Sequence, residues 1–352
     1  MAKYTALGLM SGSSLDGLDI AYCEFYLEEG KWAYKIVAAK TYNYTEEWKI
    51  KLRGLADASA REIIKANTEY AILCTDLVNK FIGETQLKPE IISSHGHTVF
   101  HEPAEGFTYQ IGDGQVIATM TKTKTICDFR SKDISLGGQG APLVPIGDEL
   151  LFGDFEFCLN IGGIANISFR ENGKRIAYDI CAANQILDFL SLQMGKPFDE
   201  NGNSAQLGKL DAHLFNALNK DAYFMEKAPK SLSNQYVTRC FIDMVNKSRC
   251  SVEDKLYTVS KHIAFQINQS TRHFPKGKIL ISGGGAHNSF LINAIKRECN
   301  HEIIIPGKTI INFKEALIFA FMGVLKNLGK INCLASVTGA KHDCSGGIEY
   351  LR

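Results

Sequence analysis

The feature that most constrains the fold of this chain is a hairpin pattern that occurs twice. Near the start, "ALGLMSGSSLDGLDIAYCEF" runs from an apolar segment through Gly and Ser around one aspartate into a second apolar segment. In the middle, "FCLNIGGIANISFREN" repeats this order. Glycine-rich turns expose consecutive backbone N–H groups that can surround an anion. The repeat predicts two related lobes, each with a phosphate-binding hairpin, although a plain β-turn explains either hairpin taken alone.

Between and after these hairpins, strands alternate with helices. We expect strands at "KYTALGLM", "LDIAYCEFYL" and "WAYKIVAAKTY", and a helical stretch from Glu46 to about Gly83. Short strands follow at "EIISSHG" and "TICDF", and "KILISGGGAHNSFLINAI" reads as a strand that enters a helix through three glycines. We expect an N-terminal lobe of residues 1–130 and a C-terminal lobe of residues 131–352, joined through "DFRSKDISLGGQGAP". The sequence leaves open whether the extreme C-terminus packs with the N-terminal lobe.

Composition limits the function classes. A chain of 352 residues is longer than one core usually supports, so two lobes with a ligand cleft between them are expected. The 39 basic and 38 acidic residues give a net charge of +1 and no bulk reason to bind nucleic acid or an anionic membrane. The stretch "EALIFAFMGVLKNL" is too short to span a bilayer, and the N-terminus turns polar too early for a signal peptide. We expect a cytoplasmic protein that binds small molecules, and the sequence leaves a homodimer open.

The sequence does not match the common motifs of zinc sites, dinucleotide-binding folds or P-loops well. The 10 cysteines form no CxxC pair, which argues against a zinc site and a disulfide framework. The segment "GGGAHN" could open a dinucleotide fold with Glu302 at the ribose, but its GxGxxG spacing ends on Asn288 and lies late in the chain. No GxxxxGK[ST] sequence is present, so a P-loop is not expected. Three glycine-rich segments in order favour a two-lobed nucleotide clamp.

Six strings together resemble one family. In chain order they are "GLMSGSSLDGLD", "SHGHTVFHEP", "DFRSKDISLGGQGAPLVP", "LNIGGIANIS", "GGGAHN" and "EALIFA", and they resemble anhydro-N-acetylmuramic acid kinases over essentially the whole chain. The resemblance implies an actin/Hsp70/sugar-kinase (ribonuclease H-like) fold, with duplicated mixed sheets and a central cleft for ATP and Mg²⁺. It also implies that water opens the 1,6-anhydro bridge of the sugar while the released 6-oxygen accepts the γ-phosphoryl group, as one step of peptidoglycan recycling.

The resemblance implies ATP contacts from all three glycine-rich segments. Asp16 is expected to hold Mg²⁺ through water, with Asp19 as the alternative or as a structural residue. Asn288 is expected near the adenosine, although an Asn at this place is as often a helix cap. The implied ATP-binding residues are Gly12, Ser13, Ser14, Leu15, Asp16, Gly17, Leu18, Asp19, Gly162, Gly163, Gly283, Gly284, Gly285 and Asn288.

A water that attacks the anomeric carbon needs a carboxylate to accept its proton. Asp179, which follows the apolar run "RIAY", matches the general base of the family. An N-cap of the helix over "AANQILDFL" is the structural alternative for this residue.

The remaining polar motifs are expected at the sugar. Arg130 could pair with the lactyl carboxylate through its forked guanidinium, and Asp133 could orient that arginine. A satisfied core histidine is the alternative for His95, and a first-turn acid favoured by the helix dipole is the alternative for Glu315. The implied substrate-binding residues are His95, Thr98, Arg130, Gln139, Asn184 and Glu315.

The chain departs from the family pattern in two places. The Gly–Pro pair usual after the catalytic aspartate is absent from "DICAAN", and His97 replaces a glutamine usual after "HG", which adds a titratable imidazole. These departures leave two alternatives open. One is a nucleotide-gated binding or regulatory module of the same fold without catalysis. The other is a kinase for a different sugar, which would deprotonate a sugar hydroxyl in place of water.

Overall fold

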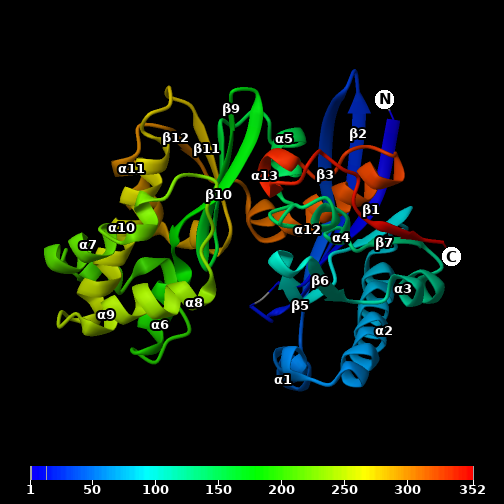
Figure 1. Cartoon of the computed structure of the whole chain (residues 1–352), viewed down its shortest axis with the longest axis horizontal. Helices are drawn as coiled ribbons and strands as arrows, with labels where there is room; N and C mark the ends of the chain where they lie inside the picture. Colours follow the sequence, from blue (N-terminus) through cyan, green and yellow to red (C-terminus); the bar gives the residue numbers. More distant parts are fainter. Residues whose placement is uncertain (1, 13, 352) are drawn as a thin grey trace. The chain divides into compact units, whose positions relative to one another are not determined.

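The computed structural model describes residues 2–12 and 14–351, and the chain divides into two compact units (Figure 1). Unit 1 comprises Met1–Gly153 and Phe313–Arg352, and unit 2 comprises Asp154–Asn312. The sequence predicted that the first lobe ends at residue 130. In the structure, residues 131–153 and 313–352 also belong to the unit that contains the N-terminal strands.

Unit 1 is built on a six-stranded mixed sheet in the order β13-β7-β4-β1-β2-β3. Strand β2 pairs antiparallel with both β1 and β3, whereas β4 pairs parallel with β1, and β7 pairs parallel with β4. A separate hairpin pairs β5 with β6. The strands are β1 (Ala2–Met10), β2 (Gly17–Glu28), β3 (Lys31–Asn43), β4 (Ile91–Ser94), β5 (His97–Glu102), β6 (Phe107–Ile111), β7 (Lys124–Cys127) and β13 (Ile348–Tyr350).

Unit 2 repeats this topology in a five-stranded sheet of order β10-β9-β8-β11-β12. Its first three strands are antiparallel, β11 pairs parallel with β8, and β12 pairs parallel with β11. The strands are β8 (Phe157–Ile161), β9 (Ile164–Glu171), β10 (Lys174–Ala182), β11 (Lys278–Ser282) and β12 (Glu302–Ile304). The duplicated mixed sheet confirms the ribonuclease H-like fold class that the repeated hairpin and the family resemblance predicted.

The helices follow the hydrophobic periodicity of the sequence. Helix α2 begins at a capping box formed by Ser59 and Glu62, and it buries Tyr70, Val78 and Phe81 in the core of unit 1. The helices of unit 1 are α1 (Glu46–Gly54), α2 (Ala60–Thr85), α3 (Gly114–Thr121), α4 (Ser131–Ser135), α5 (Pro145–Leu150) and α13 (Ala335–Thr338). Those of unit 2 are α6 (Asn184–Leu192), α7 (Ala212–Asn219), α8 (Asn234–Tyr236), α9 (Asp243–Lys247), α10 (Val252–Thr271) and α11 (Ser289–Glu298).

Helix α12 (Lys308–Asn327) crosses from one unit to the other, and the backbone of Phe313 leaves helical angles at the boundary. Beyond this kink the helix packs directly on the sheet of unit 1. A Cβ atom on Gly8 of β1 would lie 1.8 Å from the carbonyl oxygen of Ala316, so only glycine permits this approach. The Ser93 hydroxyl of β4 donates a hydrogen bond to the carbonyl of Phe319.

The three expected N-terminal strands are confirmed, and the expected helical stretch is confirmed with one interruption. Helix α1 ends at Gly54, and Ser59 starts a new helix after a 3₁₀ turn at Leu55–Asp57. None of the helices in residues 2–12 and 14–351 is long and apolar enough to cross a membrane.

Candidate active site

Most of the predicted site residues lie at the carboxyl edge of a sheet. In unit 1, the first hairpin loop follows β1, the "SHGHT" segment follows β4, and Arg130 follows β7, and these three strands run parallel. In unit 2, the second hairpin turn follows β8, the triple glycine follows β11, and Asp179 lies near the end of β10. Open α/β sheets bind their ligands at this edge.

The first hairpin loop combines open and packed positions. A Cβ atom on Gly12 would meet only the Ser14 hydroxyl, at 3.9 Å, so the backbone there is accessible to a ligand. At Gly17 a Cβ atom would lie 2.3 Å from the Tyr42 carbonyl oxygen, so the packing of β2 on β3 is enough to require this glycine. The side chains of Leu15 and Leu18 are buried in the core, which leaves only their backbone for a nucleotide. Ser13 lies outside the described residues.

Two carboxylates stand at this loop. Asp16 is exposed, whereas Asp19 is half-buried and accepts a hydrogen bond from the Thr41 hydroxyl. Burial raises the pKa of Asp19, and repulsion from Asp16 adds to this increase. In the described part of the chain, no group of three or more His, Cys, Asp or Glu residues is arranged to hold a metal ion. The exposed Asp16 nevertheless fits Mg²⁺, which commonly binds one or two carboxylates together with substrate phosphates and water.

A buried hydroxyl chain supports the same loop. The Tyr44 hydroxyl lies 2.7 Å from that of Tyr70 and donates to Ser11 Oγ over 2.8 Å. Ser11 Oγ lies 3.0 Å from Nδ1 of His97. Burial lowers the pKa of His97 to about 4, so its imidazole is neutral at pH 7. The sequence indicated that His97 differs from the family, but nothing in it indicated this partner.

The half-buried Arg130 and the buried His95 form one pair. The Nε and Nη2 groups of Arg130 approach Nε2 of His95 at 3.2 and 2.7 Å, and Nη1 donates to the Gly140 carbonyl over 2.7 Å. Nδ1 of His95 lies 2.9 Å from the Gly96 carbonyl, which assigns the proton to Nδ1 and leaves Nε2 as acceptor. Burial, followed by the charge of Arg130, holds the pKa of His95 well below its usual value. His95 is therefore a satisfied, neutral histidine that orients Arg130.

In the described part of the chain, Asp133 forms no hydrogen bond with Arg130 itself, and it supports the arginine only through Gly140, whose carbonyl accepts from Arg130. Its carboxylate accepts hydrogen bonds from the Gly140 amide at 2.8 Å and the Thr338 hydroxyl at 2.7 Å. Asp133 therefore fixes the loop that carries Gln139. The backbone N–H of Gln139 donates a hydrogen bond to the Thr338 carbonyl, and the Gln139 side chain is exposed.

Glu315 interacts electrostatically with Asp19 and Arg130. Glu315 is half-buried in the first turn after the kink of α12. Burial raises its pKa, the charge of Asp19 raises it further, and the charge of Arg130 opposes this shift. The Thr98 hydroxyl on β5 accepts a hydrogen bond from Gln110. Asp16, Asp19, Glu315, Arg130 and His95 thus form one connected polar group.

The second hairpin turn is tied to helix α6. The Gly163 carbonyl accepts from the amides of Ala183 and Gln185, and the Gly162 carbonyl accepts from Asn184. The Gly162 amide donates within the turn to Ile164 over 3.3 Å, a long hydrogen bond. The turn is therefore held rigidly against the start of α6.

Asn184 lies between the second turn and the triple glycine. Its amide donates to the Ile161 carbonyl over 3.3 Å, and a Cβ atom on Gly284 would lie 3.6 Å from its Nδ2. Gly283 has φ of 82°, and Cβ atoms on Gly283 and Gly285 would collide with the end of β8. Strand packing therefore requires glycine at these two positions, whereas a Cβ atom on Gly284 would meet only Asn184.

Asn288 is a helix cap. Its side-chain oxygen accepts a hydrogen bond from the Leu291 amide over 3.0 Å at the start of α11. The structural alternative for Asn288 is thereby confirmed, and only its amide nitrogen is left to meet a nucleotide.

Asp179 is not a helix cap, so that alternative is wrong. It lies within β10 at a bulge, and α6 begins at Asn184 with Ala183 as its N-cap. Oδ2 accepts a hydrogen bond from the Leu232 amide over 2.9 Å, and Oδ1 accepts none from the described residues of unit 2. Burial raises the pKa of this half-buried carboxyl, and the Leu232 amide opposes the increase. A carboxylate with one fixed and one open oxygen can accept a proton from water.

Asp188 is another half-buried carboxylate of unit 2, and the sequence motifs do not include it. It lies one helical turn after Asn184 on α6, and burial raises its pKa to about 6. Its spacing of four residues from Asn184 was the available signal.

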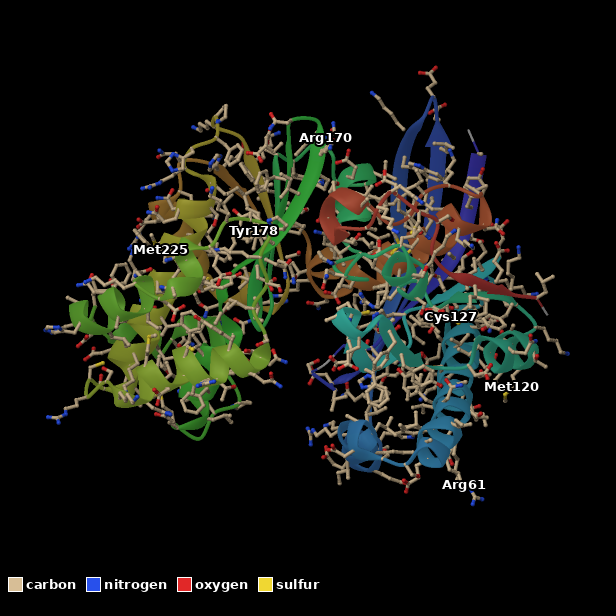
Figure 2. All side chains as sticks on the ribbon, viewed as in Figure 1. Arg61, Met120, Cys127, Arg170, Tyr178 and Met225 are labelled. Carbon is tan, nitrogen blue, oxygen red and sulfur yellow. The ribbon has the colours of Figure 1, made fainter. Side chains whose placement is uncertain are left out.

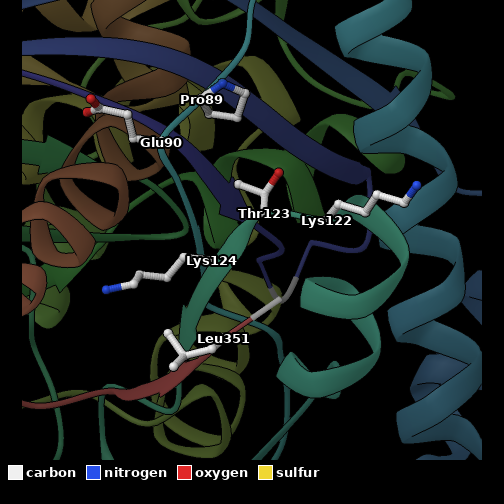
Figure 3. A pocket seen from close by; sticks show the side chains of 6 residues that line it. All are labelled: Pro89, Glu90, Lys122, Thr123, Lys124 and Leu351. Atoms are coloured by element: carbon white, nitrogen blue, oxygen red, sulfur yellow. The ribbon is translucent and has the colours of Figure 1, made fainter.

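One cavity lies at the opposite edge of the unit 1 sheet. It has a volume of 490 Å³ and is lined by Pro89, Glu90, Lys122, Thr123, Lys124 and Leu351 (Figure 3). Glu90 and Thr123 precede β4 and β7, so the cavity marks the amino ends of these strands. It contains no predicted site residue, and Lys124 is already paired with Glu349 at 3.1 Å.

Sequence comparison decides the family. The anhydro-N-acetylmuramic acid kinase family model matches residues 4–352. The chain belongs to the anhydro-N-acetylmuramic acid kinase family. The anhydro-N-acetylmuramic acid kinase of Mannheimia succiniciproducens is 32% identical over 99% of this chain and 100% of its own. That of Pseudomonas fluorescens is 33% identical over 97% of each chain. These matches confirm the resemblance and the prediction of a kinase of this family.

The solved structures that match this chain have lower sequence identity to it than these relatives. Component A of (R)-2-hydroxyglutaryl-CoA dehydratase from Acidaminococcus fermentans is 13% identical, with a TM-score of 0.49, and covers 92% of this chain and 99% of its own. A ROK family glucokinase from Streptomyces griseus, in complex with glucose and AMPPNP, is 10% identical with a TM-score of 0.42, over 91% and 99%.

The low pKa of His97 predicts an acid-sensitive contribution to stability. Because the folded-state pKa is about 4 and the unfolded value is 6.5, the contribution is complete above pH 6.5 and is lost as the pH falls toward 4. The shift corresponds to about 3 kcal/mol. We expect His97→Gln to reduce the decline in urea midpoint between pH 7 and pH 4.5.

The matched control is His213→Gln, which changes an exposed histidine of α7. It should decline with pH as the wild type does. An equal decline in His97→Gln and wild type would contradict the assignment.

Proposed function

We propose that this protein uses ATP and Mg²⁺ to open the ring of 1,6-anhydro-N-acetylmuramic acid and to phosphorylate the released 6-oxygen. The products are N-acetylmuramic acid 6-phosphate and ADP, and the reaction belongs to cytoplasmic recycling of peptidoglycan. Membership of the family supports the substrate class. The observation that carries the mechanism is the half-buried Asp179, whose Oδ2 is fixed by the Leu232 amide.

In the proposed reaction Asp179 is the general base. Oδ1 accepts a proton from water while the water oxygen bonds to the anomeric carbon and the bond from that carbon to the bridging oxygen breaks. The bridging oxygen stays on C6 and takes the γ-phosphoryl group. The raised pKa of Asp179, caused mainly by burial, makes its carboxylate a stronger base than an exposed aspartate.

Backbone groups of the glycine-rich loops are proposed to bind ATP. Gly12 and Ser14 offer an accessible loop at the phosphates, and Gly284 offers space at the adenosine. Asp16 would hold Mg²⁺ through water. When bound, the ion neutralises charge on the phosphates during phosphoryl transfer.

Arg130 is proposed to bind the lactyl carboxylate. Its contacts to His95 and Gly140 use three of the five N–H donors of a guanidinium, which leaves one on each terminal nitrogen. Two such donors match the two oxygens of a carboxylate. Glu315 balances the charge of Arg130 and supports its ionised form.

The first test measures ADP release from purified protein with Mg²⁺–ATP. We expect release with 1,6-anhydro-N-acetylmuramic acid and none above background with N-acetylmuramic acid, because the latter has no anhydro bridge. Release with N-acetylmuramic acid or a hexose in place of the anhydro-sugar would indicate another sugar kinase. ATP binding without release on any sugar would indicate a non-catalytic module.

A second test replaces the base. Asp179→Asn should lower the turnover number by roughly 100-fold or more while ATP affinity stays within twofold, because the amide cannot accept the proton. The control Asp243→Asn changes an exposed carboxylate of α9 that pairs with Lys247, and it should keep wild-type turnover. Full turnover in Asp179→Asn would remove this residue from the base role.

A further inference from the structure

Asp179, the residue proposed as the base, forms hydrogen bonds with a segment that is not part of the unit 2 sheet. β10 is the edge strand of unit 2, so one side of its backbone has no strand partner. At Asp179 that side is covered by residues 221–236, which we call the cover segment. The Tyr223 hydroxyl donates to the Asp179 carbonyl over 2.6 Å, and the Asp179 amide donates to the Lys230 carbonyl over 3.1 Å. With the Leu232 amide on Oδ2, three hydrogen bonds from one segment fix one residue.

The cover segment is itself internally braced. The ammonium of Lys230 donates to the Tyr223 carbonyl over 2.9 Å and lies 4.2 Å from the centre of the Tyr223 ring. The Asp221 carboxylate accepts from the Tyr223 amide at 2.9 Å and from the Tyr236 hydroxyl at 2.7 Å. These bonds order the segment around the Tyr223 ring, whose exposure is only 2%.

The segment also reaches the second hairpin turn. Nε2 of Gln185 donates to Asn234 Oδ1 over 2.6 Å. The side chain of Gln185 packs on Gly163, where an added Cβ atom would lie 2.9 Å from it. One segment therefore contacts both the base and the turn proposed to bind phosphate.

We infer that Tyr223 is a positioning residue that sets the direction of the Asp179 carboxylate through the Asp179 backbone. The inference rests on the base role proposed for Asp179. Among the described residues, the Tyr223 hydroxyl forms a hydrogen bond only to the backbone carbonyl of Asp179, so we assign it no part in proton transfer. Without this hydroxyl the Asp179 carbonyl loses a short hydrogen bond at a buried edge, and the carboxylate can turn away from the attacking water. Tyr223 thus acts on the chemical step and not on the affinity for either substrate.

The test compares steady-state kinetics of full-length wild type and Tyr223→Phe. We expect the turnover number to fall about tenfold with the Michaelis constants for ATP and anhydro-sugar within twofold, since only transition-state geometry is lost. The melting temperature should stay close to that of wild type, because the ring and its packing remain. A turnover number within twofold of wild type would overturn the inference. So would a fall in turnover that comes with equal loss of affinity for both substrates.

The matched control is Tyr178→Phe, at the neighbouring position of β10 (Figure 2). Successive strand residues point to opposite faces, and the Tyr178 ring packs against Phe169 with its hydroxyl on Ser270. This variant should keep wild-type turnover, and an equal loss in both variants would contradict a specific role for Tyr223.

A second variant covers the case in which Tyr223→Phe does not fold. Lys230→Met removes the ammonium that braces Tyr223 and keeps the backbone carbonyl that accepts from Asp179. It should lower turnover severalfold with unchanged Michaelis constants, and unchanged turnover would count against the inference. Wild type assayed alongside separates the claims: inactive wild type contradicts the proposed function, whereas active wild type with equally active variants contradicts only the role of Tyr223.

Discussion

Unit 1 depends on the close packing of α12 on the central strands of its sheet. The backbone of Gly8 meets the backbone of Ala316, and Gly323 of the same helix packs against Ser93 of β4. Any side chain at Gly8 would force the helix away from the sheet. This contact brings the C-terminal part of the chain back to its first strand, and it sets Glu315 beside Asp19 and Arg130. The acidic and basic groups proposed for metal and sugar therefore depend on a backbone contact that carries no chemistry itself.

The duplicated topology explains why residues far apart in the sequence gather at sheet edges. In each unit the first strand ends in a short hairpin loop, and the fourth strand runs parallel to it and ends at the same edge. Loops after parallel strands converge there, whereas the 490 Å³ cavity at the amino ends of β4 and β7 collects none of these groups. In unit 2 the third strand is an edge strand, so Asp179, the proposed base, needs a cover from another part of the chain. The segment around Tyr223 provides it.

Sequence reasoning predicted the strands, the repeated hairpin and the family, because alternating hydrophobicity and glycine-rich turns are local signals. It could not show which glycines are also required by packing, and Gly17, Gly283 and Gly285 are such positions, because an added Cβ atom would collide with a neighbouring strand. The hydrogen bond from the Thr338 hydroxyl to Asp133 could not be predicted either, because the two residues lie 205 positions apart in the sequence. The contacts of Ser11 with His97 and of Asp179 with Tyr223 likewise arise only from tertiary packing. The ATP and sugar contacts stay predictions.

The central claim is that Asp179 activates a water that becomes part of the product. The most direct measurement is the reaction in oxygen-18 water, followed within minutes by ¹³C NMR of the product, with unlabelled product in the same water as a control for exchange. We expect one labelled oxygen on the anomeric carbon and an unlabelled oxygen between C6 and phosphorus. Absence of label at the anomeric carbon, or label found only in inorganic phosphate, would contradict it.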